Sequence, residues 1–281
     1  MGMLSRLVLA GTGILVARGA MTALRRSPLA HSLERVNHKG KSISLAAGPA
    51  AAVGASVSAA AGAKNPRAAV AALTAGLGAG AVGLYDDVVG AREDQKQYKG
   101  FKGHLAALQD GKVTSGLVKI VGVGAAGLTA VALIDADRRR DGRLSLFDTL
   151  VGAGVVAGAA NVINLLDLRP GRALKATMAL GQLAGLGKTP ASGDLVSGPV
   201  AAAGALIGED LDEKVMLGDA GANALGAQLG LALTAKTGRY GRLGLFALFA
   251  AATVASEKVS FTKVIEATPV LREIDRFGRK S

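Results

Sequence analysis

Five long stretches of the sequence are apolar and nearly free of charge. They are Ile43–Ala63, Ala68–Leu84, Val113–Ile134, Leu144–Leu166 and Leu243–Ala255. Most of them approach the roughly 20 residues that an α-helix needs to cross the hydrocarbon core of a bilayer. A helix on the surface of a soluble protein would show a polar face at every turn, and these stretches do not. The pattern therefore favours an all-α, polytopic integral membrane protein.

The composition agrees with this fold class. Half of the 281 residues are hydrophobic and only 19% are charged. The 40 glycines lie largely inside the apolar stretches, where small residues let helix backbones approach closely in lipid. We therefore interpret the glycines as packing residues of a tight helical bundle.

The most economical division of the chain has about nine spans, within a range of about eight to ten. The spans are predicted at about 7–23, 43–62, 68–84, 113–134, 144–166, 173–187, 194–208, 216–235 and 243–256. If the segment Arg25–Lys41 is cytoplasmic, that side of the membrane holds nearly twice as many Lys and Arg residues as the other, as the positive-inside rule requires. The exception is the cluster Arg138–Arg140, which falls outside. The domain prediction is a single transmembrane domain, 1–256, followed by a basic cytoplasmic tail, 257–281.

The residue content excludes several kinds of site. Cysteine is absent, which rules out disulfides, thiolate nucleophiles and cysteine-ligated zinc. Three histidines are too few to predict a histidine cluster. The net charge of +12 is spread over short loops without interleaved aromatic residues, so the bilayer with its anionic lipids, together with phosphorylated substrates, is a better partner than nucleic acid.

Four aspartates stand at the ends of apolar stretches: Asp86, Asp87, Asp167 and Asp219. In the predicted topology all four lie at the cytoplasmic face. Unpaired charge at a membrane boundary is costly and tends to mark an ion or substrate site. The alternatives are ordinary ones, because adjacent acids often begin a solvated loop and an acid in the first turn of a helix is favoured by the helix dipole.

Further polar residues accompany these acids. The spacing of Asn161, Asn164 and Asp167 places two amides and a carboxylate on one helical face, although asparagines also form hydrogen bonds between helices in lipid. Asp219 lies between Gly218 and an alanine-glycine pair, where the backbone can approach a ligand closely. Lys119 lies near the start of its span, and its side chain could either reach the acids or extend to the headgroup layer.

The order of these motifs along the chain is specific: DDxxG at 86–90, NxxNxxD at 161–167 and GDxG at 218–221. With the basic segment Arg35–Gly40 and Lys119, the chain resembles the polyprenyl-phosphate N-acetylhexosamine-1-phosphate transferases, the MraY, WecA and TagO type, from about residue 35 to residue 230. The resemblance implies transfer of a sugar 1-phosphate from a UDP-sugar to undecaprenyl or decaprenyl phosphate. It also implies that UMP is released at the cytoplasmic face of a bacterial cell membrane, in cell-envelope polymer synthesis. It also implies Mg²⁺, with Mn²⁺ as an alternative ion, and makes a homodimer an expectation.

The resemblance also implies roles for individual residues. Asp86, Asp87 and Asp219 would be catalytic, with Asp219 and Asp87 as metal ligands. The substrate-binding residues would be Asn37, Lys119, Asn161, Asn164, Asp167, Arg169 and Arg172. Independent chemistry agrees, because two anionic substrates that meet head to head require a hard cation held by oxygen ligands. A phosphate monoester with a second pKa of about 6 is already largely ionised at neutral pH, so positioning and electrostatics can supply most of the catalysis.

Three departures from the family pattern keep other functions open. Leu168 and Pro170 replace a glycine and an aspartate of the second motif, Ala222 replaces a serine of the third with Asn223 beside it, and the C-terminal tail contains no histidine. One alternative is a catalytically inactive homologue that acts as a membrane scaffold or binds polyprenyl phosphate. Another is a transporter or channel, for which acids in mid-span would be expected.

Overall fold

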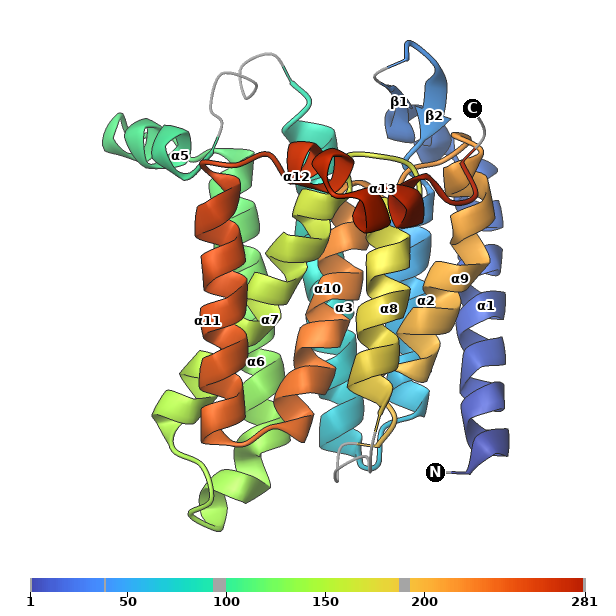
Figure 1. Ribbon diagram of the computed structural model, residues 1–281. Coiled ribbons are helices and arrows are strands. Elements are labelled where there is room, and N and C mark those ends of the chain that lie inside the picture. The colour runs from blue at the N-terminus through green and yellow to red at the C-terminus, as the bar shows by residue number, and fades with distance from the viewer. Residues whose placement is uncertain (1, 38, 93–99, 187–192, 280–281) are drawn as a thin grey trace.

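The computed structural model describes residues 2–37, 39–92, 100–186 and 193–279, and it is mostly helical (Figure 1). The long helices are α1 (Met3–Arg25), α2 (Ala47–Ala61), α3 (Pro66–Val89), α6 (Ser115–Arg140), α7 (Leu146–Leu166), α8 (Arg172–Gly185), α9 (Ser197–Leu211), α10 (Gly218–Lys236) and α11 (Arg239–Ser256). The shorter elements are a 3₁₀ helix (Pro28–Leu33), β1 (Glu34–Val36), β2 (Ser42–Ser44), α5 (Gly100–Gln109), α12 (Phe261–Ala267) and α13 (Pro269–Arg276).

A helix occupies each of the nine predicted ranges, but several boundaries differ by a few residues, and local contacts explain two of these differences. The second range was predicted to begin at Ile43, which instead lies in β2 and pairs with Arg35 of β1. The turn between these strands is held by the Asn37 side-chain oxygen, which accepts hydrogen bonds from the backbone N–H groups of Lys39 and Lys41. At the other end of the chain, α11 begins four residues early, at Arg239, because acidic partners described below satisfy its first-turn arginines.

Within the described residues, four helices are long and apolar enough to cross a membrane: α1, α3, α6 and α7. A fifth crossing is added if α11 and α12, which are bent by 94° relative to each other, form one broken span. The side chains of α1 support this assignment, since Leu4, Leu7 and Leu15 are all exposed. The structure thus confirms an all-α architecture with the properties of a membrane-associated protein.

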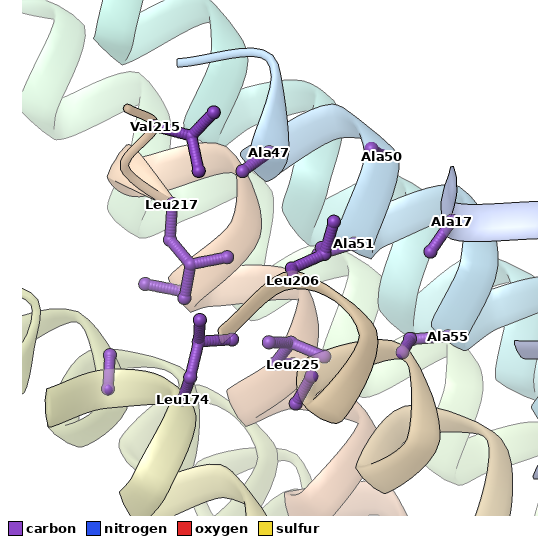
Figure 2. Close-up of a cluster of buried hydrophobic side chains, with 14 of the residues drawn as sticks. Ala17, Ala47, Ala50, Ala51, Ala55, Leu174, Leu206, Val215, Leu217 and Leu225 are labelled. Atoms are coloured by element: carbon purple, nitrogen blue, oxygen red, sulfur yellow. The ribbon is translucent and has the colours of Figure 1, made fainter. Parts of the chain in front are cut away.

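The bundle is built around α10. This helix packs against α7, α3 and α2, and nearly all of its residues are buried. Close approach depends on small residues: a Cβ added at Gly83 of α3 would lie 2.4 Å from the backbone oxygen of Asp219. Figure 2 shows the alanines of α1 and α2 packing near Leu174, Leu206 and Leu225 of α8, α9 and α10.

Successive long helices run in opposite directions, so the chain has two distinct ends. Figure 1 shows β1, β2, α12 and α13 together at the top, which we call the hairpin end, and the N-terminus at the opposite end. Side chains begin several helices locally: the side-chain oxygens of Asn65, Thr114 and Ser145 accept N–H groups from the first turns of α3, α6 and α7. Such caps satisfy amides that have no partner within the helix. Because the long helices alternate in direction, the end of α3 and the starts of α6 and α10 lie together at the hairpin end.

Candidate functional site at the hairpin end

Lys119 joins two of the predicted acids. Its Nζ lies 2.6 Å from Oδ2 of Asp86 and 2.5 Å from Oδ2 of Asp219. The three side chains come from α6, α3 and α10 and are mostly buried, with 13–24% of each exposed. The sequence left open whether Lys119 reaches the acids or extends toward the headgroups, and the structure shows that it reaches them.

Asp87 has a different geometry from its neighbour. Its two carboxylate oxygens accept hydrogen bonds of 2.9 Å from the backbone N–H groups of Asp219 and Ala220. This carboxylate therefore stabilises the N-terminus of α10, where unpaired amides and the helix dipole favour negative charge. Gly218 makes the contact feasible: its φ is +60°, and an added Cβ would lie 2.8 Å from Oδ1 of Asp87.

The carboxyl of Asp167 interacts electrostatically with Asp87 and Asp219 of this cluster. The side chain is 6% exposed, and its Oδ2 has no hydrogen-bond partner among the described residues. Burial, followed by repulsion from Asp210 and Asp87, raises the pKa of the Asp167 carboxyl well above its usual range. A small cavity of about 50 Å³ beside it is also lined by Asn37 and Arg169. The four predicted acids therefore lie in one region, in which the Lys119 ammonium contacts the carboxylates of Asp86 and Asp219 and burial favours the uncharged form of Asp167.

A groove leads away from Lys119 between α6, α7 and α11. Its volume is about 560 Å³. Apolar side chains and glycines form most of its wall, including Ile120, Val123, Gly158 and Phe246. At the hairpin end it is lined by polar groups, namely Lys119, His104, Asn223, Ser256 and Glu257. The groove therefore has a polar end beside Lys119 and mainly apolar walls elsewhere.

Three asparagines lie on or near this groove. Asn223 is 3% exposed, and its side-chain nitrogen has no hydrogen-bond partner among the described residues. Asn161 lines the groove and donates a hydrogen bond of 2.9 Å to Thr253 of α11, and Asn164 is half-buried one turn further along α7. The sequence singled out Asn223 only as a substitute for a missing serine, whereas its burial and its unused donor make it a stronger candidate.

Two other predicted substrate-binding residues have protein partners instead. Arg172 is 5% exposed and forms two bonds, 2.8 and 3.0 Å long, with the carboxylate of Asp275 in α13. Asn37 donates a hydrogen bond of 3.1 Å to Glu213. A hydrogen bond from Lys39 to the same carboxylate lowers the pKa of Glu213. Their roles toward substrate stay predictions.

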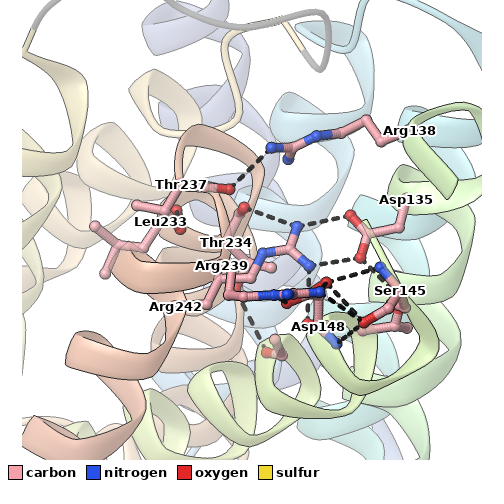
Figure 3. Close-up of polar contacts among 11 residues, drawn as sticks. Asp135, Arg138, Ser145, Asp148, Leu233, Thr234, Thr237, Arg239 and Arg242 are labelled. Atoms are coloured by element: carbon pink, nitrogen blue, oxygen red, sulfur yellow. Dashed lines mark hydrogen bonds and ion pairs between the residues drawn. The ribbon is translucent and has the colours of Figure 1, made fainter. Parts of the chain in front are cut away.

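A second polar cluster lies at the opposite end, and the sequence did not predict it (Figure 3). Arg242 is fully buried and forms two contacts of 2.6 Å with Asp135, which is also fully buried. Arg239 binds Asp148 at 2.8 and 2.9 Å. Arg138 of the basic cluster donates to the backbone oxygen of Thr237. The signal in the sequence was an acid at the end of one apolar stretch and an arginine at the start of another.

The side chains at the hairpin end include carboxylates, the ligand type that Mg²⁺ prefers. No group of three or more His, Cys, Asp or Glu side chains that could hold a metal ion occurs within the described part of the chain. Asp86 and Asp219 nevertheless direct oxygens from two helices at one cationic group, the Lys119 ammonium. Mg²⁺ is commonly held by one or two carboxylates together with phosphate oxygens of the substrate. These two carboxylates fit that pattern, and metal binding by Asp87 stays a prediction.

No protein-family model matches the chain, and the search of curated proteins found no match. We therefore infer function from the geometry of the hairpin end and from the motifs that carry the resemblance.

Proposed function

We propose that this protein is a membrane phosphotransferase that moves a sugar 1-phosphate, of the N-acetylhexosamine type, from a UDP-sugar to polyprenyl phosphate. The observation that carries the proposal is the continuity between the acid cluster and the groove. Lys119 contacts Asp86 and Asp219 and also lines a largely apolar groove of about 560 Å³. A reaction between a water-soluble nucleotide and a lipid phosphate requires such a junction of charge and apolar surface.

The groove fits the acceptor better than the donor. Polyprenyl phosphate has one anionic head and a long hydrocarbon chain. Lys119 and the unpaired amide of Asn223 lie at the polar part of the groove, where both can donate to phosphate oxygens. The apolar walls formed by α6, α7 and α11 suit the isoprenoid units. The donor then approaches from the aqueous side, near Asp167 and Arg169.

The reaction conserves phosphate and needs no oxidant. An oxygen of polyprenyl phosphate attacks the β-phosphorus of the UDP-sugar. The bond between that phosphorus and the bridging oxygen breaks, and the bridging oxygen leaves with UMP. The product is a polyprenyl diphosphate sugar. Because the attacking phosphate is already ionised at neutral pH, the side chains mainly have to align the two phosphates and offset their charge.

Asp86 and Asp219 are the residues that would hold Mg²⁺. When bound, the ion would neutralise charge on the reacting phosphates. Lys119 lies between the two carboxylates and can turn its ammonium toward a phosphate oxygen. Asp87 positions Asp219, since its carboxylate holds the first turn of α10 through two hydrogen bonds of 2.9 Å. The excess of negative side chains supports a cationic cofactor, because anionic substrates would otherwise be repelled.

The proposal includes a topology and a location. We place the hairpin end in the cytoplasm of a bacterium and the chain as a multi-pass protein of the cell membrane, with about nine crossings. Helices α2, α8 and α9 have only 14 or 15 residues and reach about 21–23 Å. Their flanking segments must complete these crossings. A homodimer remains an expectation of the family resemblance.

The experiment is UMP release by the purified full chain in detergent, with undecaprenyl phosphate, Mg²⁺ and a panel of UDP-sugars. We expect Mg²⁺-dependent release with one donor and a loss of at least about 100-fold in Asp219→Asn, because charge stabilisation at the transition state is removed. Asp137→Asn is the matched control: it makes the same chemical change at the opposite end, where Asp137 is exposed and pairs with Arg67. Equal loss in both variants would contradict the proposal.

One set of observations favours a second candidate, a catalytically inactive protein that binds polyprenyl phosphate as a scaffold. Arg172 is engaged by Asp275, and Leu168, Pro170 and Ala222 depart from the family motifs. Saturable binding of undecaprenyl phosphate without UMP release from any donor would support the scaffold and exclude the transferase.

A further inference from the structure

The C-terminal segment, Glu257–Arg279, crosses the hairpin end of the bundle and contains α12 and α13 (Figure 1). We call it the C-terminal strap. The axis of α12 is bent by 94° from that of α11. If α11 runs along the membrane normal, α12 lies close to the membrane plane. Because only a few residues separate the two helices, the strap is held at the depth at which α11 leaves the bilayer.

The strap is attached to the bundle through charged groups. Asp275 is buried, at 7% exposed, and binds Arg172 of α8 and, at 2.6 Å, Arg279. Lys175 of α8 donates to the backbone oxygens of Ile274, Asp275 and Phe277 at 2.6–3.0 Å. An ammonium at the last carbonyls of a helix is also favoured by the helix dipole. The face of α13 that contacts the protein is therefore polar.

The opposite face of α13 is apolar and exposed. Val270, Ile274 and Phe277 are 69%, 56% and 79% exposed. Their spacing of four and three residues places them along one stripe of the helix. A helix at the surface of a soluble protein has the reverse arrangement, with its apolar face against the core. Water is therefore an unfavourable environment for this stripe.

The C-terminal strap also carries exposed basic side chains. Lys258, Lys263 and Arg276 are exposed, and none of them forms an ion pair with another described residue. Exposed apolar residues together with unpaired cations on short helices that follow a membrane span are typical of segments that bind at the interface of an anionic membrane. Cations near such a surface each contribute about 1 kcal/mol.

We propose that the C-terminal strap is a membrane-docking element whose apolar stripe inserts into the headgroup region of an anionic phospholipid leaflet. The polar face of α13 stays bound to α8 while Val270, Ile274 and Phe277 contact lipid. This inference depends on the orientation of α11 in the bilayer and not on the proposed chemistry. It holds whether or not the chain transfers a sugar phosphate.

The absence of cysteine from the sequence allows a site-specific test on the full chain. Ile274→Cys and Phe277→Cys would each be labelled with an environment-sensitive fluorophore and placed in nanodiscs of phosphatidylcholine with phosphatidylglycerol. The matched control is Glu273→Cys, whose native side chain is 73% exposed on the same helix but lies beside the stripe. Lipids with brominated acyl chains would report contact through quenching.

We expect blue-shifted emission and quenching by brominated lipid at positions 274 and 277, and neither at 273. Reversing charge with Lys258→Glu and Lys263→Glu together should weaken the quenching, as should pure phosphatidylcholine. Equal solvent exposure at all three positions in both lipid compositions would overturn the proposal. So would blue-shifted emission that appears only on dimerisation and is insensitive to brominated lipid, since a second copy would then cover the stripe.

Discussion

The two ends of the bundle both contain buried charge, but they balance it differently. At the opposite end Asp135 and Asp148 face Arg239 and Arg242, and the Arg242 guanidinium donates four hydrogen bonds of 2.6–3.1 Å. At the hairpin end a single ammonium, that of Lys119, contacts two of four neighbouring carboxylates.

This difference separates a structural role from a binding role. Paired and hydrogen-bonded charges fix helices relative to one another and leave little for a ligand to satisfy. At the opposite end the buried Nε of Arg242 has no partner among the described residues, but every carboxylate of that cluster is paired with an arginine. A cluster with excess charge and unused donors is costly for the protein alone, and its cost is relieved when a ligand or ion binds. The groove adjoins the second kind of cluster, and the comparison yields four predictions.

The largest expected effect is on stability at the opposite end. Arg242→Met leaves the carboxylate of Asp135 buried without its partner, and removing one member of a buried pair costs about 3–5 kcal/mol. The double variant Asp135→Leu with Arg242→Met should recover most of this loss, because apolar replacements remove both desolvation costs. Reversible unfolding in mixed micelles measures both. Equal destabilisation by the single and double variants would show that the pair is not an isolated ionic contact.

The matching change at the hairpin end should affect activity strongly and stability little. Asp219→Asn removes one of the excess negative charges, so we expect little loss of stability or a gain. Activity should fall by about 100-fold or more, equivalent to about 2.7 kcal/mol at the transition state. The same unfolding measurement, made beside UMP release, separates the two effects. A variant that unfolds as readily as Arg242→Met would remove the distinction between the two ends.

The strap should respond to acid. Burial acts to raise the pKa of Asp275, but hydrogen bonds from Arg172 and charges of Arg172 and Arg279 outweigh it and leave the pKa below its usual value. The attachment is therefore at full strength above the ordinary aspartate pKa of about 3.9 and weakens as pH falls through the lowered value.

A spin label at Phe277→Cys should become more mobile over this acidic range, as measured by electron paramagnetic resonance. Asp275→Asn should make the label mobile at every pH, at a cost of about 1.5–3 kcal/mol for the lost charged hydrogen bonds. A label that stays immobile in this variant would show that other contacts hold the strap.

The smallest expected effect concerns Asn223. Asn223→Leu removes the buried donor that lines the groove, and one hydrogen bond to a charged group contributes about 1.5–3 kcal/mol. We expect the KM for polyprenyl phosphate to rise about tenfold or more, with the KM for the UDP-sugar unchanged. Asn161→Leu is the comparison, since that amide already bonds to Thr253. A larger effect from Asn161 than from Asn223 would place the phosphate nearer to Asn161.

Much of the fold was predictable because helix formation here follows from uninterrupted apolar sequence. A helix occupies each predicted range, and the meeting of Asp86 with Asp219 follows from their positions at helix ends. The start of α2 was predicted too early because Ile43 continues an apolar run while pairing as a strand. Composition alone does not distinguish these two uses of an isoleucine.

Long-range partners were not predictable, because each depends on packing between helices distant in sequence. Arg172 binds Asp275, 103 residues away, and Asp87 caps a helix that begins 131 residues later. Arg242 was placed in a loop because an arginine beside an apolar stretch usually lies in water. Its burial follows from its pairing with Asp135 near the end of α6, and nothing in the sequence around either residue shows that these two helix ends meet.

The central claim is that the hairpin end transfers the β-phosphate of a UDP-sugar to a lipid phosphate. The most direct test uses a donor labelled with ³²P at the β-phosphorus. The full protein is incubated with this donor and undecaprenyl phosphate, and the label is followed into the lipid that an organic solvent extracts from the reaction. We predict that wild type moves the label into the lipid phase in Mg²⁺, that Asp219→Asn does not, and that Asp137→Asn behaves as wild type. Label that stays in water with every donor, or that enters lipid equally with Asp219→Asn, would contradict the account.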